Sequence, residues 1–463
     1  MKKYSIVALV AIITASLFVS CSKDSLEPTL ADRLPAEILL EEDLRQYIDG
    51  SYNIMVDYRY WGRNIIIAGE VRADNVYANL NSGRFIAMSQ MNYNSQNGDI
   101  NEMMQYMYGS LANVNIALST EEIEGDETAI NHMKGEAYAI RALVHFDLVR
   151  LFGQQHVAGQ GGMNSLGVSY MTSFKGDEVY VPRSSVEEVK QFIYNDLDSA
   201  LSHMSTSLND PSKVRMTTQA VHAIRSRVAT YFREYDVART ASQAIMGQYQ
   251  ITPANNVVSS WSQTTPSSSS IFELAVTDID NNGIDGIGNI YRGNAYGDIQ
   301  VLEPFPTDAE FGPNDVRNSA AMIGYDSNNR LRNLGKYPMG APYSDNIKVI
   351  RYEEIVLNYA EALLETNPAE ALVHLNSIAS NRNGTTYTEA NIDNILKERR
   401  KELAFEGFRF DDLVRTGRNI PNLDPNVPHH GGKQYGDTYL ALPIPNREIR
   451  TNPFTSQNEG YTN

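Results

Sequence analysis

The sequence predicts a mostly α-helical protein with a tetratricopeptide-like helical-repeat scaffold and an irregular, loop-rich subdomain. Three observations support this prediction. Residues 134–152 have a helical pattern with two apolar faces, two later segments share one alanine spacing, and residues 251–343 lack a helical period.

Residues 134–152 (KGEAYAIRALVHFDLVRLF) are expected to form the central helix of the scaffold. At about 100° per residue, the apolar side chains fall on two opposite faces. A surface helix has one apolar stripe, so this helix is expected to pack between neighbours on both sides. Two narrow polar seams separate the faces and hold Lys134, Glu136, Arg141, His145, Asp147 and Arg150. Gly153 is expected to end the helix by adopting a positive φ.

Helical periodicity also begins near residue 41 and returns at residues 100–119 and 184–201. In the last of these, Ser184 and Ser185 precede Glu187 and Glu188. This order predicts a capped helix N-terminus, because a serine hydroxyl and a glutamate carboxylate can satisfy the first free backbone N–H groups.

Two later segments, residues 227–245 and 358–378, repeat one alanine spacing. In each, two alanines stand nine residues apart across a short turn: Ala229 and Ala238, then Ala362 and Ala371. Small side chains at fixed places allow two helices of a hairpin to approach closely, which is typical of tetratricopeptide-like repeats.

The chain is expected to comprise a signal peptide, a lipidated tether, a helical-repeat region with inserted loops, a loop-rich insertion and a C-terminal helical region with an extended tail. Their boundaries are 1–20, 21–40, 41–250, 251–343 and 344–463. The insertion contains one possible strand at residues 271–276. A long segment without periodicity in an ordered chain usually carries function or packs as its own subdomain.

Residues 396–415 (LKERRKELAFEGFRFDDLVR) are expected to form the last long helix. Glu402 and Glu406 stand four residues apart, as an acid–base pair sometimes does. Arginines flank both, however, and neighbouring cations lower the pKa of a carboxyl group. A structural ion-pair network is therefore favoured over catalysis, and no nucleophile, zinc or P-loop motif accompanies it.

The composition excludes two classes of partner. The formal charge of −17 argues against a nucleic-acid-binding protein, because phosphate contacts need clustered Lys and Arg. It also argues against electrostatic attachment to anionic lipid.

The single cysteine, Cys21, follows a basic start and an uncharged apolar run, which together indicate an export signal. Residues 17–21 (LFVSC) resemble the site cut by lipoprotein signal peptidase, with Phe18 in place of the usual leucine. We therefore expect Cys21 to become the lipidated first residue of the exported chain. An ordinary cleaved signal with an incidental cysteine is the alternative.

No cofactor is expected, and the metal motifs are weak. His429 and His430 have no third ligand at a suitable spacing, so an exposed loop is the expectation there. Asp278, Asp280 and Asn282 resemble the start of a calcium loop, but the twelfth position is Asn289 instead of glutamate.

Three clusters combine aromatic rings with amide and guanidinium groups, at residues 57–64, 74–85 and 291–296. Flat rings suit the C–H faces of sugars, and Asn and Arg suit their hydroxyl groups or the amides of a peptide. The rings could instead pack the loops against the helices. The candidate ligand-binding residues are Trp61, Tyr77, Asn79, Asn81, Arg84, Tyr291 and Tyr296.

The chain resembles the SusD/RagB family of outer-membrane nutrient-binding lipoproteins. Five stretches in the family's order support the resemblance: GEAYAIRALVHFDLVRLFG, VPRSSVEEVKQFIYNDLDSAL, RYEEIVLNYAEALL, ERRKELAFEGFRFDDLVRTGR and LPIPNREIRTNPFTSQNEGY. The resemblance implies four tetratricopeptide-like units and a less regular, ligand-facing half. It also implies a ligand site built from the loops that follow the Gly69, Glu70 and Asp74 stretch and from the long insertion, which favours Tyr77, Asn79, Asn81, Arg84 and Tyr296.

The function implied is capture of an oligosaccharide on the extracellular face of the outer membrane, without catalysis, and its delivery to a SusC-like TonB-dependent barrel transporter. Membrane lipid would hold the acylated Cys21. A peptide ligand, as in the RagB branch, is the main alternative. A surface glycosidase and a purely structural helical-repeat adaptor are further alternatives, and no nucleic-acid partner is expected.

Overall fold

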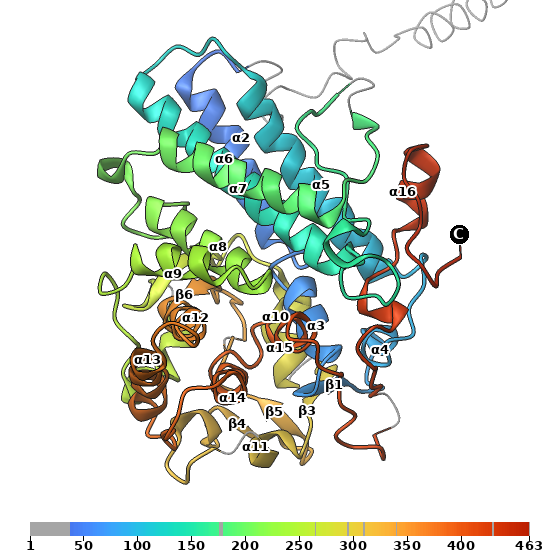
Figure 1. Ribbon diagram of the computed structural model, residues 1–463, viewed down its shortest axis with the longest axis vertical. Helices are drawn as coiled ribbons and strands as arrows, with labels where there is room; N and C mark the ends of the chain where they lie inside the picture. The colour runs from blue at the N-terminus through green and yellow to red at the C-terminus, as the bar shows by residue number, and fades with distance from the viewer. Residues whose placement is uncertain are drawn as a thin grey trace, which may run out of the picture.

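Helix α6 (Glu127–Phe152) is the central element of the structure, which is a computed structural model. The structure describes residues 38–175, 179–263, 265–293, 296–308, 311–338, 340–427 and 430–462, so the predicted signal peptide and Cys21 lie outside it. Helix α6 packs against α2 (Glu41–Val56), α5 (Gly98–Ser119) and α7 (Val186–His203), and the four form the upper layer in Figure 1. Every residue from 139 to 152 is buried, which confirms the prediction of a helix packed on both faces.

The polar seams of α6 are buried ion pairs that connect it to its neighbours. Arg141 lies 2.7 Å from Asp196 of α7, and Glu136 lies 2.7 Å from Arg45 of α2. The reason expected for Gly153 was wrong: its φ is −73°, and a Cβ there would lie 2.6 Å from the Val149 carbonyl oxygen. Glycine is needed for space and not for a left-handed backbone. The predicted cap is confirmed, because Ser185 and Glu188 form a capping box at the start of α7.

Two helical hairpins lie below the first layer (Figure 1): α8 (Thr218–Tyr231) with α9 (Tyr235–Gln243), and α12 (Tyr352–Ala362) with α13 (Pro368–Asn381). Ala229, Ala238 and Ala362 pack together where the hairpins meet, and Ala371 packs against Tyr359. This packing confirms that the alanine spacing serves close helix approach in repeated hairpins.

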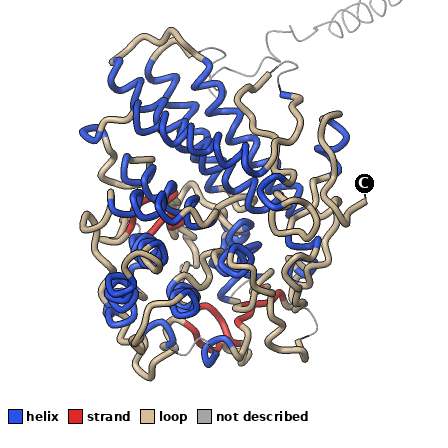
Figure 2. The backbone as a smooth tube through the Cα atoms, in the orientation of Figure 1, coloured by secondary structure: helices blue, strands red, loops and turns tan. Residues whose placement is uncertain are grey.

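In the part of the chain that the structure describes, three short antiparallel strand pairs lie among the helices (Figure 2). They are β1 (Val76–Ala78) with β3 (Ile299–Val301), β2 (Ser270–Leu274) with β6 (Ile347–Arg351), and β4 (Ile323–Tyr325) with β5 (Leu331–Asn333). Strand β2 confirms the strand expected near residue 271. The first two pairs join segments far apart in the sequence, because β1 and β6 lie outside the insertion that supplies β3 and β2, whereas β4 and β5 form a local hairpin.

The long helix expected at residues 396–415 is two helices, α14 (Ile392–Glu402) and α15 (Arg409–Arg415). The chain bends between them at Phe405 and Gly407, whose φ values are 70° and 87°. Helix α3 (Asn64–Val71) touches this bend so closely that a Cβ on Gly69 would lie 2.1 Å from the Gly407 carbonyl oxygen. The expectation was wrong because this tertiary contact has no local signature.

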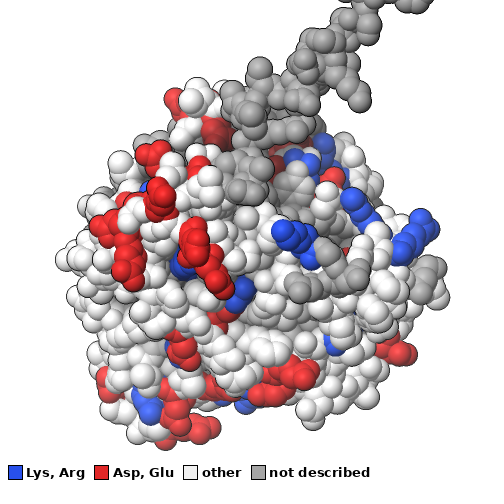
Figure 3. Space-filling view, turned by 90° about the horizontal axis from the view of Figure 1, so that it is seen from above, with Lys and Arg blue, Asp and Glu red and all other residues white. Residues whose placement is uncertain are grey.

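The remaining helices are short: α4 (Ile86–Ser89), α10 (Ile287–Arg292), α11 (Phe305–Asp308) and α16 (Asn446–Thr451). No helix in the described ranges is both long and apolar enough to cross a bilayer. Charge is unevenly spread: on the face shown in Figure 3, acidic side chains gather mainly to the left and below, and basic ones gather to the upper right.

Candidate functional site

Strand pairing brings two of the predicted aromatic clusters together. Tyr77 of β1 stands opposite Gln300 of β3, so the loops that leave these strands begin side by side. The Asn79 N–H donates to the Asp298 carbonyl at 2.8 Å, and the Asn81 side-chain amide donates to the Tyr296 carbonyl at 2.6 Å. Residues 77–84 and 296–298 therefore form one surface, although about two hundred positions separate them in the sequence.

The candidate site, which we call the binding face, comprises Tyr77, Asn81, Arg84 and Tyr296 of this surface, with Tyr325 and Arg330 of the β4–β5 hairpin. All six side chains are at least partly exposed. The Arg84 guanidinium carbon lies 3.7 Å from the centre of the Tyr296 ring. Arg330 donates to the Asn81 side-chain oxygen at 3.3 Å. The face thus presents rings next to planar hydrogen-bonding groups.

Two carboxylates flank the Arg84 guanidinium of the binding face. Arg84 lies 3.6 Å from Asp285 and 4.0 Å from the buried Asp298. Among the described residues, none donates a hydrogen bond to Asp298 Oδ2, so this oxygen remains available as an acceptor beside Arg84. Burial raises the pKa of Tyr77, while the nearby Arg332 and Arg330 guanidiniums oppose the rise. Tyr77 is therefore a neutral donor at physiological pH.

Asn79 lies buried beneath the binding face, and its hydrogen bonds position neighbouring residues of that face. Its amide donates to the Gly297 carbonyl at 2.8 Å and the Gln300 side chain at 3.0 Å. Its side-chain oxygen accepts the Asn81 N–H at 2.8 Å. The prediction that Asn79 contacts a ligand is corrected on this basis, because its polar atoms are already used to position Asn81.

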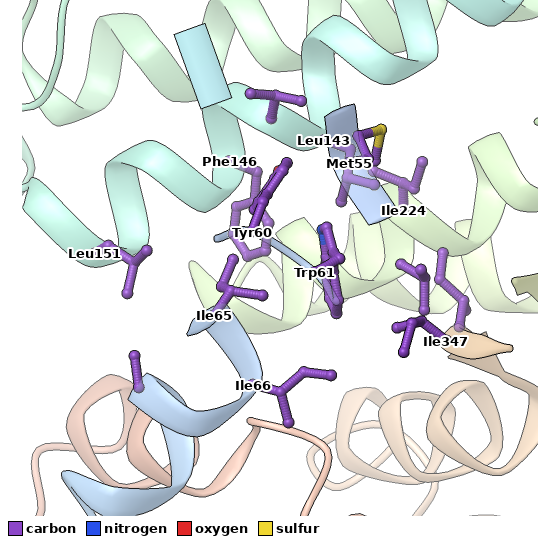
Figure 4. Packing of buried hydrophobic residues seen from close by; sticks show 14 of the residues in the cluster. Met55, Tyr60, Trp61, Ile65, Ile66, Leu143, Phe146, Leu151, Ile224 and Ile347 are labelled. Atoms are coloured by element: carbon purple, nitrogen blue, oxygen red, sulfur yellow. The ribbon is translucent and has the colours of Figure 1, made fainter. Parts of the chain in front are cut away.

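Trp61 and Tyr291 are core residues, and their assignment as ligand contacts is also corrected. Trp61 is 3% exposed and donates from Nε1 to Asp147 at 3.0 Å. Figure 4 shows it within the packed cluster that includes Tyr60 and Phe146. Tyr291 is 1% exposed and stacks on Tyr337. The packing interpretation of these rings holds, because neither ring has a face open to a ligand.

Two recesses formed by described residues lie apart from the binding face. A cavity of about 30 Å³ beside Trp61 has room for about one water molecule and is lined by paired charges such as Arg415 and Asp412. A groove of about 800 Å³ lies between the ends of the two hairpins, near Arg233 and Glu365. None of the predicted ligand contacts other than Trp61 lines either recess.

The carboxylates that resembled a catalytic pair form a buried ion network. Glu402 lies 2.9 Å from Arg382, 3.1 Å from Arg351 and 3.2 Å from Arg317. Burial opposes ionisation of Glu402, but these three cations outweigh it and hold its pKa well below the ordinary value. Glu406 is paired with Arg351 at 2.7 Å, and its pKa is also lowered. The network confirms the structural interpretation, since a general acid needs a raised pKa.

Glu70 and Asp74, which the resemblance placed near the ligand site, are buried structural groups. Glu70 accepts the Gly407 N–H at 2.9 Å, and burial raises its pKa to about 7. Asp74 lies 2.6 Å from Arg409; burial opposes its ionisation, but Arg409 and Arg400 lower its pKa to about 2. Both carboxylates tie α3 and β1 to the α14–α15 bend.

Two of the candidate metal ligands, Asn282 and His430, have structural roles. Asn282 accepts the Tyr58 N–H and donates to the Val56 carbonyl, both at 2.8 Å, so its amide is not directed at Asp278 or Asp280. His430 is buried and contacts the Ala73 carbonyl at 2.7 Å, which corrects the expected exposed loop; His429 lies outside the described residues. Within the described ranges, no three acidic, His or Cys side chains are placed to hold a metal ion.

The sequence did not indicate Tyr325 and Arg330 as members of the binding face. They stand at either end of the β4–β5 hairpin turn, and Tyr325 is 55% exposed with its hydroxyl donating to Glu303 at 2.8 Å. The run DSNN between them is a recognisable turn. Two strands of three residues are too short for the period-two pattern to reveal them.

Two family models match the chain. One, described as starch-binding associating with outer membrane, matches residues 24–230, and one described as the SusD family matches residues 309–461. Together they span most of the sequence. The chain belongs to the SusD/RagB family.

Full-length relatives of this SusD-family protein agree with the assignment. It is 25% identical to SusD-like protein P38 and 24% identical to SusD-like protein P2 of Formosa agariphila, and each match covers all of both chains. The structure superposes on a SusD superfamily protein from Bacteroides vulgatus with a TM-score of 0.83 and 26% identity, covering 92% of this chain and 100% of the other.

Other solved structures share the fold. A SusD superfamily protein from Bacteroides thetaiotaomicron gives a TM-score of 0.80 at 28% identity, over 91% of this chain and 100% of that one. Surface glycan-binding protein A from the same species, solved with laminarihexaose, gives 0.71 at 16% identity, over 90% and 99% of the two chains. These matches confirm the predicted helical SusD-like fold.

Proposed function

We propose that this protein is a cell-surface lipoprotein that captures an oligosaccharide and delivers it to a TonB-dependent outer-membrane transporter. One observation carries the proposal: β1–β3 pairing assembles Tyr77, Asn81, Arg84 and Tyr296 into a single exposed face. Family membership supports a binding function, and one solved relative is a laminarin-binding SusD-like protein.

The chemistry of the face suits a sugar. The rings of Tyr77 and Tyr296 offer flat apolar surfaces for C–H groups, while Asn81, Arg84 and Arg330 offer donors and acceptors for hydroxyl groups. The face is open to water, so part of its hydrogen bonding is exchanged with solvent and the affinity is expected to be modest.

Replacing both Arg84 and Tyr296 by alanine is expected to weaken glycan binding by about tenfold or more, because the stacked pair supplies the apolar platform and the fixed donors together. Calorimetric titration with a panel of neutral oligosaccharides, including laminarihexaose, measures the effect. Tyr435→Ala is the matched control, because Tyr435 is also exposed but lies outside the binding face. Unchanged affinity of the double variant would place the site elsewhere. Binding of peptides but of no glycan would favour the RagB-type alternative, and release of new reducing ends would indicate a glycosidase.

Replacing Cys21 by alanine is expected to move the protein from the membrane fraction to the soluble fraction, because the acyl chains on Cys21 would be its anchor. The residue lies outside the described ranges, so this prediction rests on the signal-peptide pattern. Fractionation of cells that express each form measures it. Equal membrane retention of the variant would contradict the anchor, and co-purification of wild type with a barrel transporter would test the proposed partner.

A further inference from the structure

A second group of rings and guanidinium lies outside the binding face. The Arg59 guanidinium carbon lies 4.1 Å from the centre of the Tyr106 ring and 4.7 Å from that of Tyr58. Asp57 accepts from the Arg59 Nε and Nη2 atoms at 2.8 and 2.9 Å. We call Tyr58, Arg59 and Tyr106 the second stack; all three are partly exposed.

The guanidinium of the second stack is paired with a carboxylate at two points. Its hydrogen bonds to Asp57 raise the pKa of Arg59 above the ordinary value, so the guanidinium stays charged. The two hydrogen bonds fix the plane of the guanidinium, and the two neighbouring rings pack against it. Because Asp57 already pairs with Arg59, the stack offers flat surfaces and hydrogen-bonding edges, and the charge of its one guanidinium is already compensated. Such a surface suits an uncharged, hydroxyl-rich ligand better than an ionic one.

Three short contacts connect the second stack to Arg84 of the binding face. The Arg63 guanidinium carbon lies 4.4 Å from the centre of the Tyr58 ring. Asp285 lies 3.5 Å from Arg63 and 3.6 Å from Arg84, and Arg84 lies 3.7 Å from the Tyr296 ring centre. The buried Arg63 and the partly exposed Asp285 therefore lie between the second stack and Arg84, and one extended molecule that covers Asp285 can reach both sets of rings.

The loop that carries Asp285 stands between the two stacks and is held firmly. Asn282 fixes it to the backbone of Val56 and Tyr58, and the Arg63 guanidinium donates to the Asp285 carbonyl at 3.1 Å. Ile284, next to Asp285, is 45% exposed. The loop thus adds an apolar contact at the midpoint of the path.

We propose that the second stack is a further subsite for the same ligand, so that the protein takes an uncharged glycan chain of several units and not a short sugar. The inference rests on the proposed function. In this arrangement the binding face holds one end of the chain, while Tyr58, Arg59 and Tyr106 hold the units beyond Asp285.

The test is calorimetric titration with neutral oligosaccharides of increasing length, from disaccharides to the parent polysaccharide, in the laminarin, starch, xylan and mannan series. Wild type is expected to bind longer members of one series more tightly. The double variant Arg59→Ala/Tyr106→Ala is expected to keep wild-type affinity for the shortest bound member and to bind the longest about tenfold more weakly. Arg59→Lys keeps the charge but loses the planar contact, and it is expected to weaken long-chain binding alone.

The outcomes separate the two proposals. Equal affinity of wild type and double variant for every length, or equal loss at every length in a variant with wild-type thermal stability, would overturn the second subsite and leave the proposed function standing. If only short sugars bind, the second subsite is also wrong. If wild type binds no glycan of any length, the proposed function fails and the second subsite fails with it.

Discussion

Replacing Glu402 by alanine is expected to lower the free energy of unfolding by about 3–5 kcal/mol. Glu402 is 3% exposed and is the carboxylate that Arg317, Arg351 and Arg382 share. Its removal leaves three buried cations with too few partners, and an uncompensated buried charge costs more than the original ion pair contributed. Chemical denaturation followed by circular dichroism measures the effect.

Glu365→Ala is the matched control for this prediction, because Glu365 lies exposed beyond the end of α12. A change within about 0.5 kcal/mol is expected there. If Glu402→Ala were as mild as the control, the network around α14 would not be essential to stability. The catalytic interpretation of Glu402 would then need to be reopened.

Replacing Trp61 by alanine is expected to lower the free energy of unfolding by about 3–5 kcal/mol, as for other large aromatic side chains removed from a core. The indole fills the space next to Tyr60 and Phe146, and its N–H donates to Asp147 of α6 (Figure 4). Trp61→Phe keeps most of the volume and loses the hydrogen bond, so its expected cost is about 1–2 kcal/mol. The same denaturation measurement applies.

Glycan titration separates this prediction from the sequence-based expectation that Trp61 contacts the ligand. Under conditions in which the variant stays folded, Trp61→Ala is expected to bind glycan with wild-type affinity, because the indole has no open face. Lost binding in a folded Trp61→Ala protein with unchanged stability would show that the ring belongs to the ligand site after all.

Local patterns in the sequence were sufficient for the helical scaffold. The two apolar faces at residues 134–152 predicted a helix buried on both sides. The spacing of apolar residues along a helix shows directly which of its faces are buried. The alanine spacing predicted the two hairpins, and the Ser185 cap predicted the start of α7. Each of these features depends on residues within a few turns of one another.

The candidate site could be predicted only in part. Tyr77, Asn81, Arg84 and Tyr296 were found from composition and resemblance, and the structure places them on one face. Trp61 and Tyr291 have the same residue types in similar contexts, yet both are buried. Aromatic rings serve cores and binding surfaces equally well, and the local sequence does not record which side of a loop faces solvent.

By itself, the sequence determined the fold class, the repeated hairpins, the ionic character of residues 396–415 and the family. Only the tertiary structure decided the break between α14 and α15, the pairing of β1 with β3, and the division of the aromatic residues between core and surface. The physical reason is the separation along the sequence over which each interaction acts. Helical period, caps and alanine spacing act between near neighbours, whereas the contact of Gly69 with Gly407, or of Arg84 with Tyr296, joins residues that only the folded chain brings together.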